Sequence, residues 1–205
     1  MKLLIATNNP GKIREYQELL ADLSLELTSP AQEGLDIEVA ETGGSFAENA
    51  RLKAIAYARA SGLLTLADDS GLEVDALGGE PGIRSARYAG EGASDEERYQ
   101  LLLERLKDVP WEERTARFRC VIAVATPDRE VYTAEGSCEG IIAFEPEGKH
   151  GFGYDPVFYL PEYGKTMAEL PPEVKNKISH RAKAAQKTRE FLAQISRTTL
   201  EGQNE

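Results

Sequence analysis

The stretch that decides the fold class is Lys2-Leu3-Leu4-Ile5-Ala6-Thr7-Asn8-Asn9-Pro10-Gly11-Lys12. Residues 2–6 form a short apolar run, which predicts a buried strand, and the Asn-Pro-Gly sequence that follows is typical of a turn. From Lys12 onward apolar side chains recur at helical spacing as far as Leu23. A strand, a loop containing glycine and a helix in this order predict an α/β fold. The same start favours a strand over a signal peptide.

The rest of the chain extends this pattern. Further strands are expected at 25–27, 63–67, 115–125 and 130–138, the last continued over 139–144, with a short extended piece at 36–39. Further helices are expected over 46–60, behind a capping box at Ser45 and Glu48, then behind a capping box at Ser94 and Glu97, and after Ser179. Residues 78–92 and 146–164 are expected to be loops. Because helices alternate with strands early and strands follow one another late, the prediction is an α/β fold with a mixed sheet.

Composition limits the class of protein. Of the 205 residues 41% are hydrophobic, which is enough for a real core, and we expect a single domain over 1–197, with one lobe or two, and a polar tail over 198–205. The longest apolar run, 120–125, is far shorter than the ~20 residues that cross a membrane as a helix, so no membrane partner is expected. Cys120 and Cys138 form neither a metal-binding pair nor a disulfide framework, which favours a reducing, cytoplasmic setting.

The charge balance excludes a further class. With 24 basic and 35 acidic side chains the net charge is −11, whereas proteins that bind nucleic acid usually present a basic face. No nucleic-acid partner is therefore expected. An anionic substrate must instead meet a local basic cluster or a metal ion.

The first candidate site is the loop Thr7, Asn8, Asn9, Pro10, Gly11, Lys12. A loop between a strand and a helix presents backbone N–H groups at the positive end of the helix dipole, which suits a phosphate group. The spacing is not that of a Walker A loop. The alternative is an ordinary strand-to-helix turn.

Two acidic segments form the second candidate. Asp68-Asp69-Ser70-Gly71 ends a predicted buried strand, where the sites of α/β proteins are usually built, and adjacent carboxylates on a strand point to opposite faces. Glu41, in the loop before a helix, would form with Asp69 a sparse oxygen site typical of Mg²⁺. The alternatives are an Asx-type turn at 68–71 and a solvated acidic loop around Glu41.

Two more segments of the second half could bind a ligand. Gly151-Phe152-Gly153-Tyr154-Asp155-Pro156 places an aromatic ring between two glycines, where it could stack on a base or lie buried in a tight turn. The other segment carries Lys175, Lys177, His180 and Arg181 around a helix start, against the favourable sign of the helix dipole. These cations are either held for a ligand or form a solvated basic face.

Taken together, these segments resemble the inosine/xanthosine triphosphate pyrophosphatase family over nearly the whole chain. The segments that carry the resemblance, in the family's order, are 7–12, 41–43 with 46–50, 67–72, 77–79, 81–82, 85–88, 151–156 and 178–181. Any one of them is weakly specific, but the complete series in register is highly specific.

The resemblance implies an elongated α/β fold with a central mixed sheet flanked by helices and an active-site cleft between two lobes, usually as a homodimer. It implies Mg²⁺-dependent hydrolysis of ITP, dITP and XTP to the nucleoside monophosphate and pyrophosphate, which cleanses the nucleotide pool. Carried over by position, residues 7–12 and Ser70 would hold the triphosphate, Glu41 and Asp69 the metal, and Asp69 would activate water. The residues that would surround the purine and the sugar are Phe152, Gly153, Tyr154, Asp155, Lys175, His180 and Arg181. Lys53 is a further candidate for phosphate contact.

Base selection follows from hydrogen-bond chemistry. Hypoxanthine and xanthine carry an acceptor at O6 where adenine carries a donor amine. Donors from Lys175, His180 or Arg181 would bond O6 and would leave adenine with donor facing donor, at ~1–3 kcal/mol for each unpaired buried group.

Two alternative functions stay open. One is a related pyrophosphatase of the septum-inhibitor type, acting on modified pyrimidines or methylated nucleotides, against which Phe152 and residues 178–181 speak. The other is a nucleotide-sensing protein without turnover. The presence of both Glu41 and Asp69 argues for catalysis, because a sensor needs no activated water.

Overall fold

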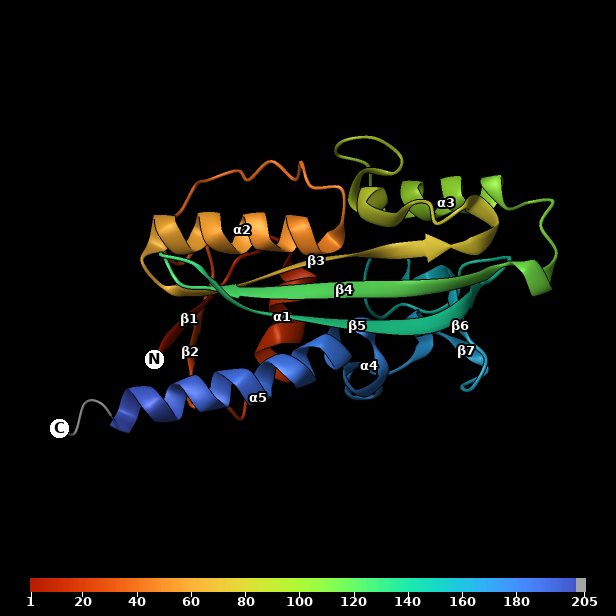
Figure 1. Ribbon diagram of the computed structural model, residues 1–205. Coiled ribbons are helices and arrows are strands. Elements are labelled where there is room, and N and C mark those ends of the chain that lie inside the picture. Colours follow the sequence, from red (N-terminus) through yellow and green to blue (C-terminus); the bar gives the residue numbers. More distant parts are fainter. Residues whose placement is uncertain (202–205) are drawn as a thin grey trace. The chain divides into compact units, whose positions relative to one another are not determined.

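The computed structural model describes residues 1–201, and it describes their side chains except at 130, 131 and 197–201. The strands are β1 (Lys2–Ile5), β2 (Glu26–Thr28), β3 (Leu64–Val74), β4 (Thr115–Ala125), β5 (Glu130–Ile142), β6 (Phe158–Leu160) and β7 (Lys165–Thr166) (Figure 1). The α-helices are α1 (Pro10–Leu19), α2 (Phe46–Ser61), α3 (Asp95–Arg105), α4 (Pro172–Ile178) and α5 (His180–Glu201). No helix in this described part is long and apolar enough to cross a membrane.

The strands form one mixed sheet of seven in the order β2-β1-β3-β4-β5-β6-β7. β1 runs parallel to both of its neighbours, with Leu3 opposite Leu27 of β2 and Leu64 of β3. β6 runs antiparallel to β5 and to β7. The α/β fold with a mixed sheet and flanking helices, predicted from the sequence, is confirmed.

The chain divides into two compact units, of which unit 1 comprises residues 1–69, 120–136 and the chain from 181 onward. In this unit α2 covers one face of the sheet, and α1 and α5 cover the opposite face (Figure 1). The core on the α1 and α5 side is closed by aliphatic and small side chains from β1, β3, β4 and the two helices, among them Leu3, Ile5, Leu66, Ile122 and Leu192.

Unit 2 comprises residues 70–119 and 137–180. It contains α3, α4 and the carboxyl-terminal half of β3. Its core is built around aromatic and aliphatic side chains, among them Leu72, Leu102, Phe118, Tyr154 and Phe158. Cys138 lies in this core and Cys120 in that of unit 1, and both are free thiols, so the prediction that they form no disulfide is confirmed.

Capping residues explain where two helices begin. Before α3 the predicted box is complete, because the Ser94 hydroxyl accepts the Glu97 N–H and Glu97 accepts the Ser94 N–H. Before α2 it is only half formed. Ser45 accepts the Glu48 N–H at 3.2 Å, but the Glu48 carboxylate accepts from Gly44 instead. α2 ends at Gly62, whose φ of +71° only glycine adopts without strain.

Several expected boundaries are wrong. β3 does not end at residue 67 but continues through Asp68, Asp69 and Ser70, because the polar side chains find partners within the fold. Residues 36–39 belong to no strand. The expected loop at 78–92 contains a 3₁₀ helix at Gly82–Arg87, and the one at 146–164 contains a 3₁₀ helix and β6.

The carboxyl-terminal region also differs from the prediction. α4, which carries Lys175, was not expected, and Ser179 is the single residue between α4 and α5. α5 continues to Glu201, four residues into the predicted tail, and residues 202–205 lie outside the described part. The domain boundaries and the cleft between lobes stay predictions.

Candidate active site

The amino terminus of α1 forms the first part of the site. Asn9 caps the helix: its Oδ1 accepts the backbone N–H groups of Gly11 at 2.8 Å and Lys12 at 3.2 Å. Thr7 Oγ1 accepts the Asn9 N–H at 3.2 Å, and Pro10 follows the cap, where a free N–H is not needed. Both interpretations of this segment hold locally, because a well-capped turn is also a helix start whose dipole favours an anion.

Asp68 lies on the face of β3 that α1 and α5 cover. Lys12 Nζ donates to its Oδ1 at 3.0 Å, and Arg181 Nε and Nη2 donate to its Oδ2 at 3.2 and 3.1 Å. Arg181 Nη1 donates to Glu15 Oε2 at 2.6 Å. Burial raises the pKa of the Asp68 carboxyl, but the charges of Lys12 and Arg181 hold it well below its usual range. Asp68 is therefore a permanent carboxylate that ties α1 to α5.

Asp69 points to the opposite face, towards α2. Lys53 Nζ donates to Asp69 Oδ1 at 3.0 Å and to Glu41 Oε1 at 2.7 Å. Asn49 is fully buried, and its amide donates to Asp69 at 3.2 Å and accepts the Gly43 N–H at 2.8 Å. One amide therefore fixes the loop of Glu41 beside the strand of Asp69.

The environment of Asp69 suits a proton acceptor. Burial, with a further contribution from the Glu41 carboxylate, raises the pKa of Asp69 above its ordinary value, although Lys53 acts in the opposite direction. A carboxylate with a raised pKa holds an abstracted proton better than an exposed one does. Its neighbour Asp68, with a lowered pKa, is poorly suited to that task.

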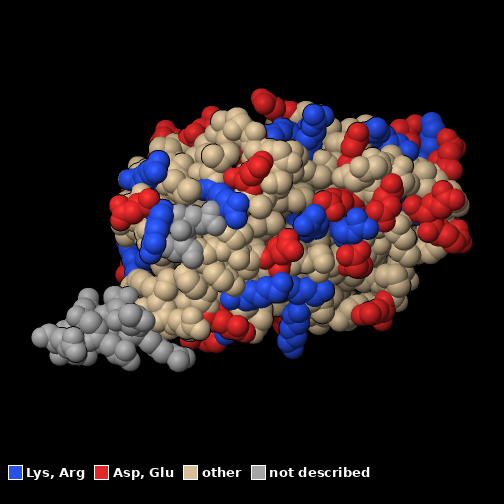
Figure 2. Space-filling view, in the orientation of Figure 1, with Lys and Arg blue, Asp and Glu red and all other residues tan. Residues whose placement is uncertain are grey.

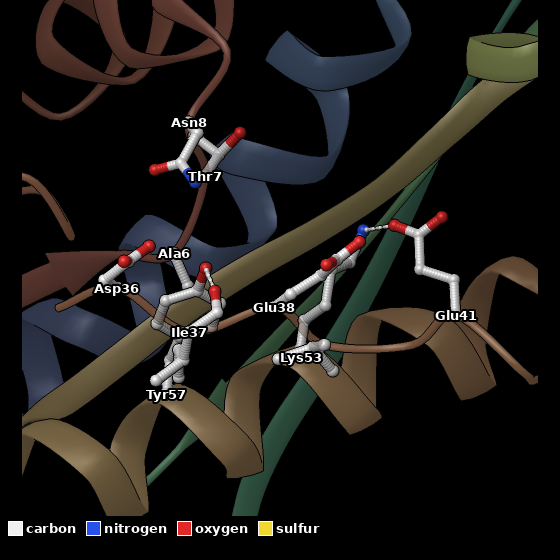
Figure 3. A pocket seen from close by; sticks show the side chains of 10 residues that line it. Ala6, Thr7, Asn8, Asp36, Ile37, Glu38, Glu41, Lys53 and Tyr57 are labelled. Atoms are coloured by element: carbon white, nitrogen blue, oxygen red, sulfur yellow. Dashed lines mark hydrogen bonds and ion pairs between the residues drawn. The ribbon is translucent and has the colours of Figure 1, made fainter. Parts of the chain in front are cut away.

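A pocket of about 440 Å³ opens in unit 1 beside these groups (Figure 3). Its lining residues are Ala6, Thr7, Asn8, Asp36, Ile37, Glu38, Val39, Glu41, Lys53 and Tyr57. The Tyr57 hydroxyl donates to the Ile37 carbonyl at 3.0 Å and so holds the irregular segment 36–39 in place. The pocket brings the start of the predicted phosphate loop together with Glu41 and with the Lys53 ammonium.

The residues that could hold a metal ion are few. Within residues 1–201, apart from the undescribed side chains, no three His, Cys, Asp or Glu side chains gather as a metal site. Glu41 and Asp69 remain as a pair. One cation, the Lys53 ammonium, already bridges their oxygens, which shows that the pair accepts positive charge. Two carboxylates completed by waters and substrate phosphates fit the coordination habits of Mg²⁺.

The predicted base-binding loop lies in unit 2 and is organised by a buried carboxylate. Asp155 Oδ2 accepts the Phe152 N–H at 2.9 Å and the Lys175 ammonium at 2.5 Å. Lys175 Nζ lies 4.8 Å from the centroid of the Phe152 ring. Gly151 has φ +78°, and a Cβ on it would lie 2.0 Å from the Asp155 carboxylate. The half-buried Phe152 ring thus contacts Lys175 of α4, and its backbone is fixed by Asp155 of its own loop.

The remaining side chains of this loop are anchors. Tyr154 is 4% exposed, and its hydroxyl donates to the Ser85 carbonyl at 2.9 Å, so this ring belongs to the core. Gly153 N–H donates to Asp95 at the start of α3, at 2.6 Å. Asp95 was not among the predicted site residues, and its place in the first turn of a capped helix is the only signal for it in the sequence.

Burial decides several alternatives that the sequence left open. Lys175, His180 and Arg181 are 5%, 5% and 1% exposed, so these three do not form a solvated basic face, whereas Lys177 is exposed. His180 stacks on Phe118 with 4.7 Å between ring centroids. Glu41 is paired rather than solvated, and no Asx turn occurs at residues 68–71.

The structure thus gathers the predicted site residues into two sets. Unit 1 holds Thr7, Asn8, Asn9, Pro10, Gly11, Lys12, Glu41, Asp69 and Arg181, and unit 2 holds Ser70, Phe152, Gly153, Tyr154, Asp155, Lys175 and His180. The role of each residue towards a substrate stays a prediction. Sequence reasoning missed Asn49, although its spacing of four residues from Lys53 places both on one helix face.

Comparison with known proteins agrees with this fold. The model of the Ham1 family matches residues 3–191. A dITP/XTP pyrophosphatase of Desulforamulus reducens is 54% identical over 195 residues, covering 95% of this chain and 97% of the relative. A protein of the same name from Bacillus subtilis is 50% identical over 92% of this chain and 96% of the relative.

Solved structures show the same similarity. A HAM1 protein from Coxiella burnetii superposes with a TM-score of 0.85 at 43% identity, covering 95% of this chain and 99% of that one. The Staphylococcus aureus Ham1 protein superposes with a TM-score of 0.83 at 45% identity, over 94% and 98% of the two chains. Fold and site define an α/β protein with a carboxylate pair beside a helix-start loop. The chain belongs to the Ham1 family.

The buried pairs of Asp68 generate the first prediction. Asp68→Asn leaves Lys12 and Arg181 without their shared carboxylate, and breaking a buried pair costs about 3–5 kcal/mol of unfolding free energy. The folded-state pKa lies below the unfolded value, so this stabilisation is complete at pH 7 and is lost as the pH falls below ~4. Urea denaturation at pH 7 and at a pH below ~4 measures the difference in unfolding free energy between variant and wild type.

The matched control is Asp128→Asn, in an exposed turn, which should leave stability unchanged. A deficit of Asp68→Asn below about 1 kcal/mol at pH 7, or one that grows on acidification, would contradict the assignment of Asp68 as a permanent carboxylate.

Proposed function

We propose that this protein hydrolyses dITP, ITP and XTP to the nucleoside monophosphate and pyrophosphate, with Mg²⁺. The observation that carries the proposal is Asp69, a buried carboxylate of raised pKa beside the pocket at the phosphate loop. The relatives named dITP/XTP pyrophosphatase support the choice of substrates. Acidic and basic side chains are interspersed on the face shown in Figure 2, so the substrate's negative charge must be met within the site.

The chain's own residues supply most of the mechanism. The start of α1 and the Lys12 ammonium neutralise charge on the phosphate oxygens, while Asp69 accepts the proton of the water that attacks the α-phosphorus. The bond from that phosphorus to the bridging oxygen breaks, and pyrophosphate leaves. Glu41 and Asp69 would hold Mg²⁺, which when bound polarises the phosphate oxygens and water.

Base selection is assigned to buried donors. Lys175 and His180 in unit 2 are held by Asp155 and Phe118, so they are oriented before a base arrives. Nε, Nη1 and Nη2 of Arg181 each already donate to a carboxylate, of Asp68 or Glu15. Arg181 would therefore have to donate to O6 in addition to these bonds. Phe152 supplies the stacking surface.

The proposal extends to assembly and location. The family resemblance supports a homodimer, and the two reduced, buried cysteines support a cytoplasmic location.

A panel of nucleoside triphosphates tests the function. Pyrophosphate release should be faster from dITP, ITP and XTP than from ATP, by at least ~30-fold in kcat/KM, because two donor mismatches at ~1–3 kcal/mol each combine. A preference for modified pyrimidines would favour the septum-inhibitor type. Binding without turnover would favour a nucleotide sensor.

Asp69→Asn tests the proton acceptor. Loss of a general base should lower kcat by at least the ~10²–10⁴ attributed to such catalysis, while circular dichroism shows an intact fold. Asp108→Asn, an exposed site, is the control and should keep wild-type turnover. If Asp69→Asn retains more than about a tenth of wild-type kcat at saturating Mg²⁺, Asp69 is not the base.

Phe152→Ala separates stacking from core packing. Stacking on a base is worth ~1–3 kcal/mol in nucleic-acid sites, so KM for purine triphosphates should rise roughly ten-fold or more while Tm hardly changes. Tyr163→Ala is the control: this residue lies in a turn and is 41% exposed, so its replacement should alter both quantities little. A large fall in Tm with unchanged KM, as for a core phenylalanine, would withdraw the base-binding role of this loop.

A further inference from the structure

Lys53 occupies the space between the two carboxylates that are proposed to hold Mg²⁺. Its ammonium lies 2.7 Å from Glu41 Oε1 and 3.0 Å from Asp69 Oδ1, and the bridge to Glu41 is drawn in Figure 3. The three side chains are largely buried, with 13%, 26% and 8% of their surfaces exposed. One positive charge is thus shared by two carboxylates in a place with little water.

We infer that Lys53 is a resident counter-ion that a divalent cation must displace, an inference that rests on the proposed function for the identity of that cation. Mg²⁺ requires oxygen ligands at 2.0–2.1 Å, closer than either oxygen lies to the ammonium. An ammonium that hydrogen-bonds both oxygens repels a dication and competes for the same lone pairs. Lysine and metal therefore exchange at the pair Glu41 and Asp69.

A Lys53 ammonium displaced by the metal can move into the neighbouring pocket. Lys53 lines the 440 Å³ pocket together with Thr7 and Asn8 of the predicted phosphate loop. Its four-carbon stem is flexible and its ammonium is a point charge, which suits a move from carboxylate to phosphate. An anionic substrate entering the pocket would draw the ammonium off the carboxylates, so anion and metal favour each other's binding.

In the absence of a divalent cation Lys53 also keeps the pair assembled. Glu41 and Asp69 both lie within hydrogen-bond distance of one ammonium, so the two carboxylates are close enough to repel each other. Without Lys53 this repulsion has no local counter-charge. The Asn49 amide still connects the loop of Glu41 to β3, but it carries no charge to offset this repulsion.

The test measures metal binding by the nucleotide-free protein, so it is independent of turnover. Mn²⁺ is the probe, followed by electron paramagnetic resonance. Lys53→Met should bind Mn²⁺ at least ~10-fold more tightly than wild type, because even in water a unit charge near a dication is worth that much. Its Tm without metal should be lower than that of wild type and should recover on addition of Mn²⁺.

Three variants are the controls. Lys53→Arg keeps the charge and should bind Mn²⁺ as weakly as wild type. Lys107→Met removes the same charge from an exposed pair with Glu104 and should leave Mn²⁺ affinity unchanged. Adding Glu41→Gln to Lys53→Met should abolish the gain. If Lys53→Met is too unstable to measure, Lys53→Gln, which can still donate to one carboxylate, replaces it with the same expected direction.

Mn²⁺ binding by folded Lys53→Met or Lys53→Gln that is equal to or weaker than that of wild type would overturn the inference. So would a gain that survives Glu41→Gln, because the metal would then lie elsewhere. Failure of the proposed function looks different: no triphosphate in the panel would be hydrolysed, whatever the Mn²⁺ affinities of these variants.

Discussion

Unit 1 depends on the neutralisation of two adjacent buried carboxylates, Asp68 and Asp69, on β3. A strand sends neighbouring side chains to opposite faces, so the two charges cannot share one partner. Each buried charge costs several kcal/mol unless it is paired. The helices on the two faces meet this need separately, α1 and α5 with Lys12 and Arg181, and α2 with Lys53. The positions of the three helices are thus coupled to the two charges on the strand.

The pairing of these buried charges is compatible with the proposed binding of a polyanion by a protein of net charge −11. The two lysines near the pocket are held in fixed positions by carboxylates, so their positive charge stays close to the pocket. Lys12 lies in the first turn of α1 and pairs with Asp68, and Lys53 lines the pocket and pairs with Asp69. An incoming phosphate therefore competes with protein carboxylates for both lysines.

Much of this could be predicted from the sequence, because it depends on local patterns. The apolar run of β1 and the alternation of strands and helices define the fold class, and the capping residues of α3 are visible as a motif. The end of β3 could not be predicted, because Asp68 and Asp69 look like strand breakers until their partners on other elements are known. For the same reason Asn49 and the buried state of Arg181 were invisible, since each depends on contacts far apart in the sequence.

The two faces of β3 also differ in what their cations can do. Arg181 is 2% exposed, donates to both Asp68 and Glu15, and carries a planar group that keeps its charge at every physiological pH. We therefore expect Arg181 to stay paired with these carboxylates when a ligand binds. Lys53 instead lines a pocket, bears a compact charge on a flexible stem and bridges two carboxylates of which one has a raised pKa. The same dipeptide thus joins a permanent ion pair that supports the fold to an exchangeable one that a ligand can open, and the strand's alternation places the two pairs on opposite faces of the sheet.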